Sequence, residues 1–135
     1  MSRFILVSAM LLFAAVLASC GGETTAKKIY LEFRAKYEDK DYKGMLELLT
    51  EKTKTKLENL GGGDAVAGLQ KKLETDKALQ RAFSIKLEDL GKILENRMLK
   101  NEGSGYIGFR FPGEGTYKWN IVKQQNSDKW LINLP

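Results

Sequence analysis

The chain has 135 residues, of which 43% are hydrophobic and 29% are charged, a composition that is ordinary for a folded domain and excludes a disordered one. It contains no histidine and one cysteine, which excludes histidine-based catalytic triads, histidine-ligated zinc or copper sites and an intramolecular disulfide. The formal net charge of +5 suits an anionic membrane surface but is too small for a dedicated nucleic-acid binder, so we expect no nucleic-acid partner. We also expect no metal and no cofactor.

The chain opens with an apolar run. Arg3 gives a short positive start, and residues 4–17 are then predominantly apolar. The run is shorter than the ~20 residues that a transmembrane helix needs, and small residues follow it, as at the end of an export signal. Residues 17–20, Leu-Ala-Ser-Cys, resemble the lipobox of bacterial lipoproteins, in which the cysteine thiol receives a diacylglycerol and the chain is cut just before it.

This resemblance predicts how the chain is divided. Residues 1–19 are expected to be a signal peptide, Cys20 the site of lipid attachment, residues 20–25 a short tether, and residues 26–135 a single domain. More than one acyl chain makes such an anchor stable. The alternatives are an uncleaved N-terminal membrane helix and a plain secretory signal with a chance cysteine. The domain is expected in the cell envelope, on the outer side of the cytoplasmic membrane, and in a Gram-negative cell at the outer membrane.

The first half of the domain predicts helices that begin at capping residues. Apolar side chains recur at helical spacing, and each recurrence follows a threonine or aspartate that can accept a hydrogen bond from the first turn. The expected helices are residues 26–38 after Thr24 or Thr25, a second helix after Asp41 with Tyr42, Met45, Leu46 and Leu49 on one face, residues 50–60 after Thr50 packing through Leu57 and Leu60, and a helix after Asp64 carrying Val66, Leu69 and Leu73. Three glycines, residues 61–63, are expected to end the third helix.

The second half predicts strands. Apolar residues alternate over residues 106–111, 116–123 and 130–134, and turn residues at 112–115 and 126–128 separate these segments. Residues 103–105, Gly-Ser-Gly, predict a further hairpin turn. Residues 83–99 fit both periods, because Phe83, Ile85 and Leu87 alternate whereas Leu87, Leu90 and Leu94 have helical spacing; we interpret them as two strands broken near Gly91. The fold class is therefore α+β, with N-terminal helices packed on a curved antiparallel sheet.

Two stretches carry a resemblance to a known family. Ala26, Ile29, Tyr30 and Phe33, followed by the Lys-Asp-Tyr-Lys-Gly-Met stretch at residues 40–45, resemble the opening of small NTF2-like lipoproteins, and residues 117–123 and 128–132 resemble their last hairpin. The resemblance implies a cone in which a bent sheet wraps a long helix, often around a pocket. Because such domains often pair through their sheets, it also leaves a homodimer open. No catalytic residue of the family can be mapped onto this chain, so the resemblance implies a fold and not an activity.

Six aromatic residues are the candidate pocket lining: Tyr30, Phe33, Tyr37, Phe109, Tyr117 and Trp119. Helix and strand spacing points them inward, which makes them hydrophobic core or, where the cone is open, the wall of a ligand site with tyrosine hydroxyls as polar anchors. We expect a non-catalytic binding module for a small apolar ligand or an envelope protein. The alternatives are a structural lipoprotein with a filled cone and an enzyme that uses Asp and Tyr.

Overall fold

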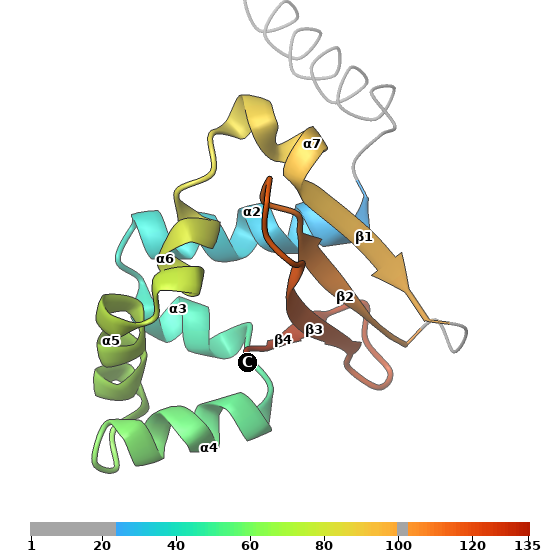
Figure 1. Ribbon diagram of the computed structural model, residues 1–135. Helices are drawn as coiled ribbons and strands as arrows, with labels where there is room; N and C mark the ends of the chain where they lie inside the picture. The colour runs from blue at the N-terminus through green and yellow to red at the C-terminus, as the bar shows by residue number, and fades with distance from the viewer. Residues whose placement is uncertain (1–23, 100–102) are drawn as a thin grey trace, which may run out of the picture.

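The structure, a computed structural model, describes residues 24–99 and 103–135. Within these ranges it is an α+β fold in which helices pack against a four-stranded antiparallel sheet, as the sequence predicts (Figure 1). The helices are α2 (Thr25–Glu38), α3 (Tyr42–Glu47), α4 (Glu51–Leu60), α5 (Ala65–Thr75), α6 (Lys77–Phe83), a 3-10 turn η1 (Leu87–Asp89) and α7 (Leu90–Ile93). The strands are β1 (Leu94–Met98), β2 (Ser104–Phe109), β3 (Tyr117–Lys123) and β4 (Trp130–Asn133).

The four predicted helix caps are confirmed. The side chains of Thr24, Asp41, Thr50 and Asp64 accept hydrogen bonds from backbone N–H groups of the first turns of α2, α3, α4 and α5, at 2.9–3.2 Å. These bonds satisfy donors that the start of a helix leaves without an intrahelical partner. One detail of packing differs, because Leu57 of α4 is buried whereas Leu60 is 41% exposed at the end of the helix.

The prediction of two strands in residues 83–99 is wrong for most of the segment. Asp76 accepts a hydrogen bond from Leu79 N–H at 3.1 Å and caps α6, whose buried residues Leu79, Ala82 and Phe83 have helical spacing. Leu87, which completes the apparent alternation, is 64% exposed in η1. Gly91 lies within α7, and only Leu94–Met98 forms a strand. The alternating pattern predicted a strand wrongly because it begins at Phe83, which is the last residue of α6, and α6 begins at Lys77, before the segment.

The sheet is a meander with strand order β1-β2-β3-β4, which confirms the predicted antiparallel pairing of the last three strands. The registers Ile107↔Trp119 and Ile121↔Ile132 place apolar side chains on one face, which α2 and α6 cover. The predicted turn at residues 103–105 is wrong in part, because Ser104 and Gly105 already pair with β3. A Cβ on Gly105 would lie 2.2 Å from the carbonyl oxygen of Arg97, so only glycine permits this approach of β1 and β2.

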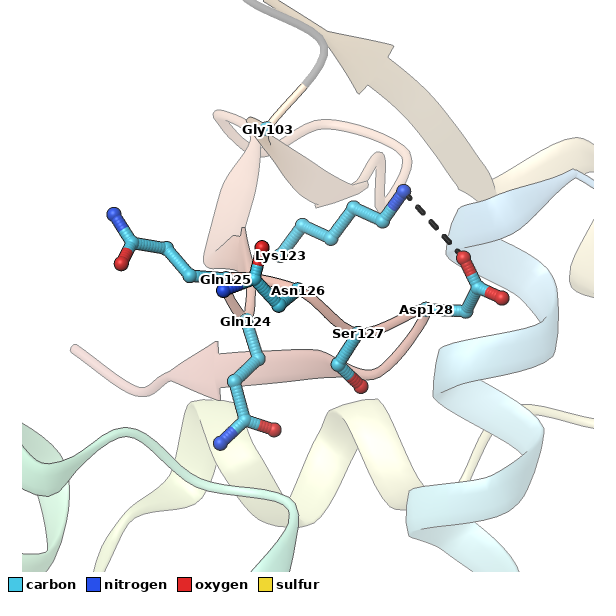
Figure 2. Close-up of a pocket in the computed structure, with 7 residues that line it drawn as sticks. All are labelled: Gly103, Lys123, Gln124, Gln125, Asn126, Ser127 and Asp128. Atoms are coloured by element: carbon cyan, nitrogen blue, oxygen red, sulfur yellow. Dashed lines mark ion pairs between the residues drawn. The ribbon is translucent and has the colours of Figure 1, made fainter.

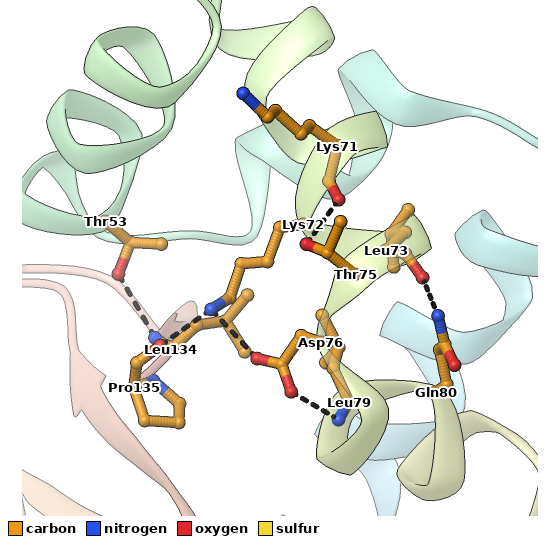
Figure 3. A network of polar contacts seen from close by, with 10 residues as sticks. All are labelled: Thr53, Lys71, Lys72, Leu73, Thr75, Asp76, Leu79, Gln80, Leu134 and Pro135. Carbon is orange, nitrogen blue, oxygen red and sulfur yellow. Dashed lines mark hydrogen bonds and ion pairs between the residues drawn. The ribbon is translucent and has the colours of Figure 1, made fainter.

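The last strand is tied to the helices by hydrogen bonds. Ile132 exchanges backbone bonds with Leu48 and Thr50 at 2.7 and 2.9 Å, which adds the α3–α4 connection to the edge of β4 as a single parallel bridge. Further along, Leu134 N–H donates to the buried Thr53 hydroxyl at 3.1 Å, and Lys72 Nζ donates to the Pro135 carbonyl at 2.9 Å (Figure 3). The end of β4 is therefore fixed between α4 and α5, and the exposed edge that an open sheet would present there is covered.

Candidate functional site

The structure brings the six predicted aromatic residues into one cluster. Tyr30, Phe33, Phe109 and Trp119 have no solvent exposure, and Tyr37 and Tyr117 are partly buried at its margins. Trp119 is the centre: its ring lies 4.7 Å from that of Phe109, 5.5 Å from that of Phe33 and 6.0 Å from that of Tyr30. The pairs with Phe109 and Phe33 are edge-to-face and the pair with Tyr30 is stacked, and both arrangements at these distances are favourable for aromatic rings.

A seventh aromatic ring, which sequence reasoning did not include, belongs to this cluster. Phe83 of α6 stacks on Tyr37 at 4.2 Å and lies 5.6 Å from both Phe33 and Trp119. It packs between Tyr37, near the end of α2, and Trp119 of β3. The signal that could have identified it is Asp76, an N-cap residue followed by apolar residues at helical spacing.

Tyr30 is held by hydrogen bonds on both sides of its hydroxyl. The hydroxyl donates to the Ala82 carbonyl at 2.6 Å and accepts from Arg34 Nη1 at 3.0 Å, and Arg34 also donates to the Ile85 carbonyl. Burial raises the pKa of Tyr30, and the nearby Arg34 opposes that rise. Tyr30 thus joins α2 to the end of α6 and is fully engaged as a structural anchor.

The polar atoms of Tyr117 and Trp119 are in the opposite situation. Neither the Tyr117 hydroxyl nor the Trp119 indole N–H forms a hydrogen bond, although both atoms are buried. Burial raises the pKa of Tyr117 to about 12; the nearby indole partly offsets this rise without meeting hydrogen-bond geometry, and the charge of Asp76 adds to it. Tyr117 is therefore neutral at physiological pH and retains a proton that it can donate.

The carboxylate of Asp76, whose charge acts on Tyr117, is hydrogen-bonded to other groups. Burial opposes its ionisation, but hydrogen bonds from Leu79 N–H and from Lys72 Nζ, at 3.1 and 3.0 Å, lower the pKa of the carboxyl below its usual value. Each carboxylate oxygen is thus occupied (Figure 3). Asp76 supplies a fixed negative charge at the start of α6.

The two tyrosines lead to opposite predictions for the same substitution. Tyr30→Phe removes two hydrogen bonds and is expected to lower the free energy of unfolding by about 1–3 kcal/mol. Tyr117→Phe removes a hydroxyl that has no partner and is expected to change stability by less than about 0.5 kcal/mol, or to increase it. Urea denaturation of the two variants at neutral pH, followed by circular dichroism, measures both effects; a loss in Tyr117→Phe as large as in Tyr30→Phe would contradict this assignment.

Tyr117→Phe and the wild type are also expected to differ in their stability in alkaline solution. The pKa of Tyr117 in the folded protein, about 12, lies above the ordinary tyrosine value of 10.0. Its neutral form therefore contributes stability that is complete below pH 10 and is lost as the pH rises toward 12. Tyr117→Phe is expected to lose less stability than the wild type across this window, while the raised pKa of Tyr30 still leaves some loss in both.

Two hollows lie where the β3–β4 turn meets the first turns of α2. One, of about 440 Å³, is formed by the turn itself and by Gly103, with Lys123 Nζ 3.7 Å from a carboxylate oxygen of Asp128 (Figure 2). The second, of about 330 Å³, lies between α2 and the start of β4. It is lined by Thr25, Lys28, Ile29, Glu32, Leu48, Asp128, Lys129 and Trp130. Trp130, whose spacing within β4 predicts core, is not among the six predicted lining residues, yet it lines this hollow.

Two further hollows lie away from that end. One of about 240 Å³ has Tyr117 in its wall together with Arg81, whose guanidinium stacks 4.1 Å from the Phe111 ring and pairs with Glu114. One of about 180 Å³ lies between α4 and the end of the chain, with Leu57 and Leu60 in its wall.

Three features concern membranes and metals. Cys20 lies outside the described residues. Among residues 24–99 and 103–135, no helix has the length and apolar character needed to cross a bilayer. In the same ranges, no group of three or more cysteine or acidic side chains is placed to hold a metal ion.

Comparison with protein-family models, with curated proteins and with solved structures finds no match to this chain.

Proposed function

We propose that the protein is a lipid-anchored, non-catalytic binding module of the cell envelope, attached to a membrane through Cys20. The observation that carries this proposal is the Leu-Ala-Ser-Cys motif at residues 17–20, directly after an apolar run too short to span a bilayer. The described domain begins at Thr24, four residue steps after the proposed attachment point at Cys20. At ~3.5 Å per residue, the domain is held within about 14 Å of the attachment point.

The packing of the core favours binding at the surface over binding inside the domain. Four aromatic rings of the cluster are fully buried, and Phe83 of α6 fills the space between α2 and the sheet. The two hollows of about 440 and 330 Å³ lie outside this cluster, along the β3–β4 turn and the first turns of α2. An envelope protein bound on an outer surface is therefore the better-supported partner. The helices followed by a four-stranded meander are consistent with an NTF2-like domain whose cone is filled.

One variant tests the anchor directly. Cys20→Ala removes the only thiol in the chain and is expected to abolish lipid attachment and signal processing. The wild-type protein should be recovered from the membrane fraction in a shortened form that partitions into detergent, and Cys20→Ala should keep the length of the precursor. Normal maturation and membrane binding of Cys20→Ala would refute the proposal. Thr24→Ala, which changes a residue beyond the motif, is the matched control and should mature normally.

The partnerless atoms of Tyr117 and Trp119 favour a second candidate, a small apolar ligand that carries one hydrogen-bond acceptor. The hollow of about 240 Å³ reaches Tyr117 from the outside, and an acceptor that entered there would satisfy a buried donor. Native mass spectrometry of the protein after exposure to lysate of its host is the test. A discrete bound mass that is lost in Tyr117→Phe supports the ligand, and an unliganded mass in wild type and variant alike refutes it.

A further inference from the structure

We propose that one end of the domain lies on the membrane itself and contacts anionic phospholipid headgroups. We call this surface the tether end and define it by Lys28, Met98, Leu99, Val122, Lys129 and Trp130. The proposal rests on the anchor at Cys20 and goes beyond it, because it assigns the orientation of the domain and the residues that contact lipid.

The topology brings these residues to one end of the sheet. β1 ends at Met98 and β2 begins at Ser104, while β3 ends at Lys123 and β4 begins at Trp130. The register links them in a row across the strands, with Ser104 opposite Val122 and Lys123 opposite Trp130. The beginning of α2 lies over the same end, as Figure 1 shows on its right-hand side.

Two contacts fix the start of α2 there. The Ala26 N–H donates to Asn96 Oδ1 on β1 at 3.0 Å, and Thr25, Lys28 and Ile29 share the wall of the 330 Å³ hollow with Lys129 and Trp130. The chain enters the domain at this point, so the proposed lipid lies within about 14 Å of Thr24, next to the first turn of α2. The anchor therefore holds this end, rather than α4 or α5, nearest the bilayer.

The tether end exposes apolar side chains that a bilayer interface would cover. Leu99 is 53% exposed, Val122 is 43% exposed and Met98 is 38% exposed. Trp130, at the start of β4 on the other edge of the sheet, is partly exposed and lines the hollow. Tryptophan is enriched at the level of the headgroups, where one side of its ring is apolar and its N–H meets water. Five large apolar side chains are exposed in the described part of the chain, and three of them lie at this end.

The charge at this end complements an anionic surface. Lys28 and Lys129 are exposed and, within the part of the chain that the structure describes, have no ion-pair partner. Lys123 is paired with Asp128, and Glu32 is the other acid in the hollow. Lysines therefore outnumber acids around the start of α2 and the β3–β4 turn. Lysines near an anionic leaflet strengthen binding by about fivefold each.

Quenching of tryptophan fluorescence by brominated lipids tests the orientation. The chain contains two tryptophans, of which Trp119 is fully buried and Trp130 is partly exposed at the tether end. The full chain is purified from the membranes of cells that express it and reconstituted into phosphatidylcholine vesicles with and without phosphatidylglycerol. We expect quenching in wild type, its loss in Trp130→Phe, and stronger quenching with phosphatidylglycerol.

Paired charge variants give the matched comparison. Lys28→Gln combined with Lys129→Gln is expected to lower the equilibrium constant for contact with phosphatidylglycerol vesicles by roughly 25-fold, at about fivefold for each lysine. Lys71→Gln combined with Lys77→Gln, at exposed positions on α5 and α6, should leave quenching unchanged. Equal effects of the two pairs would overturn the proposal.

The intact mass of the reconstituted sample separates the two possible failures. A lipidated Cys20 without quenching of Trp130 would overturn the orientation alone. An unmodified Cys20 would overturn the anchor and, with it, the orientation that rests on it.

Discussion

Trp119→Ala is expected to lower the free energy of unfolding by about 3–5 kcal/mol, because it empties the centre of the aromatic cluster. The indole contacts rings from α2, α6, β2 and β3, so its loss leaves a cavity bounded by four elements that cannot all move inward together. A domain of this size has roughly 5–15 kcal/mol of stability in total. The variant should therefore unfold at much lower urea concentration, as measured by far-ultraviolet circular dichroism.

Trp119→Phe is the matched control for this substitution. Phenylalanine keeps a ring at the centre of the cluster and removes an indole N–H that has no hydrogen-bond partner. The loss of stability should therefore be less than about half of that in Trp119→Ala. Equal losses in the two variants would show that the ring contacts do not carry the stability of the core.

Gly68→Ala is the second large effect. Gly68 lies in α5 where this helix crosses α4, and a Cβ there would be 1.7 Å from the carbonyl oxygen of Leu57. That oxygen belongs to the helix backbone, so the clash cannot be relieved by a side-chain rotation. We expect α4 and α5 to separate, at a cost of about 3 kcal/mol or more, above the usual range for overpacking because backbone must move. Thermal and urea denaturation measure this loss.

Gly91→Ala tests the same chemical change where there is space. Gly91 is exposed in α7, and nothing lies within 4 Å of a Cβ built on it. Alanine is the better helix former, so this variant should be more stable by about 0.5–1 kcal/mol. Opposite signs for the two glycines are the expected result. A Gly68→Ala variant as stable as Gly91→Ala would contradict the close packing of α5 on α4.

The elements that could be predicted from the sequence are those fixed by short-range signals. Thr50 and Asp64 each cap the turn that directly follows them, so the start of each helix is determined within three or four residues. The strands β3 and β4 alternate with period two because only one face meets the helices. Both signals are complete within a short window of sequence.

The elements that could not be predicted depend on contacts between distant residues. Phe83 and Ile85 look like neighbours on one face of a strand, but Phe83 is the last residue of α6 and packs on Tyr37 and Trp119 from other elements. The cluster of six aromatic rings could be predicted as a set that points inward. The place of Phe83 among these rings could not be predicted, because the position of α6 is set by tertiary packing.

The tether end could not be predicted from the sequence for a similar reason. Met98 and Lys28 are 70 residues apart in the chain, and their elements meet through the packing of α2 on β1, which includes the bond between Ala26 N–H and Asn96 Oδ1. A second group of lysines, Lys52, Lys54 and Lys56, lies on α4, where Lys54 pairs with Glu51 at 3.2 Å.

The most direct test of the central claim is the mass of the N-terminal peptide of the protein recovered from the membranes of its own host. The account predicts a chain that begins at Cys20 and carries a diacylglyceryl group on its thiol, with or without a further acyl chain on its amino group. A chain that retains residues 1–19, or one that begins at another residue with an unmodified thiol, would contradict the anchor and the orientation inferred from it.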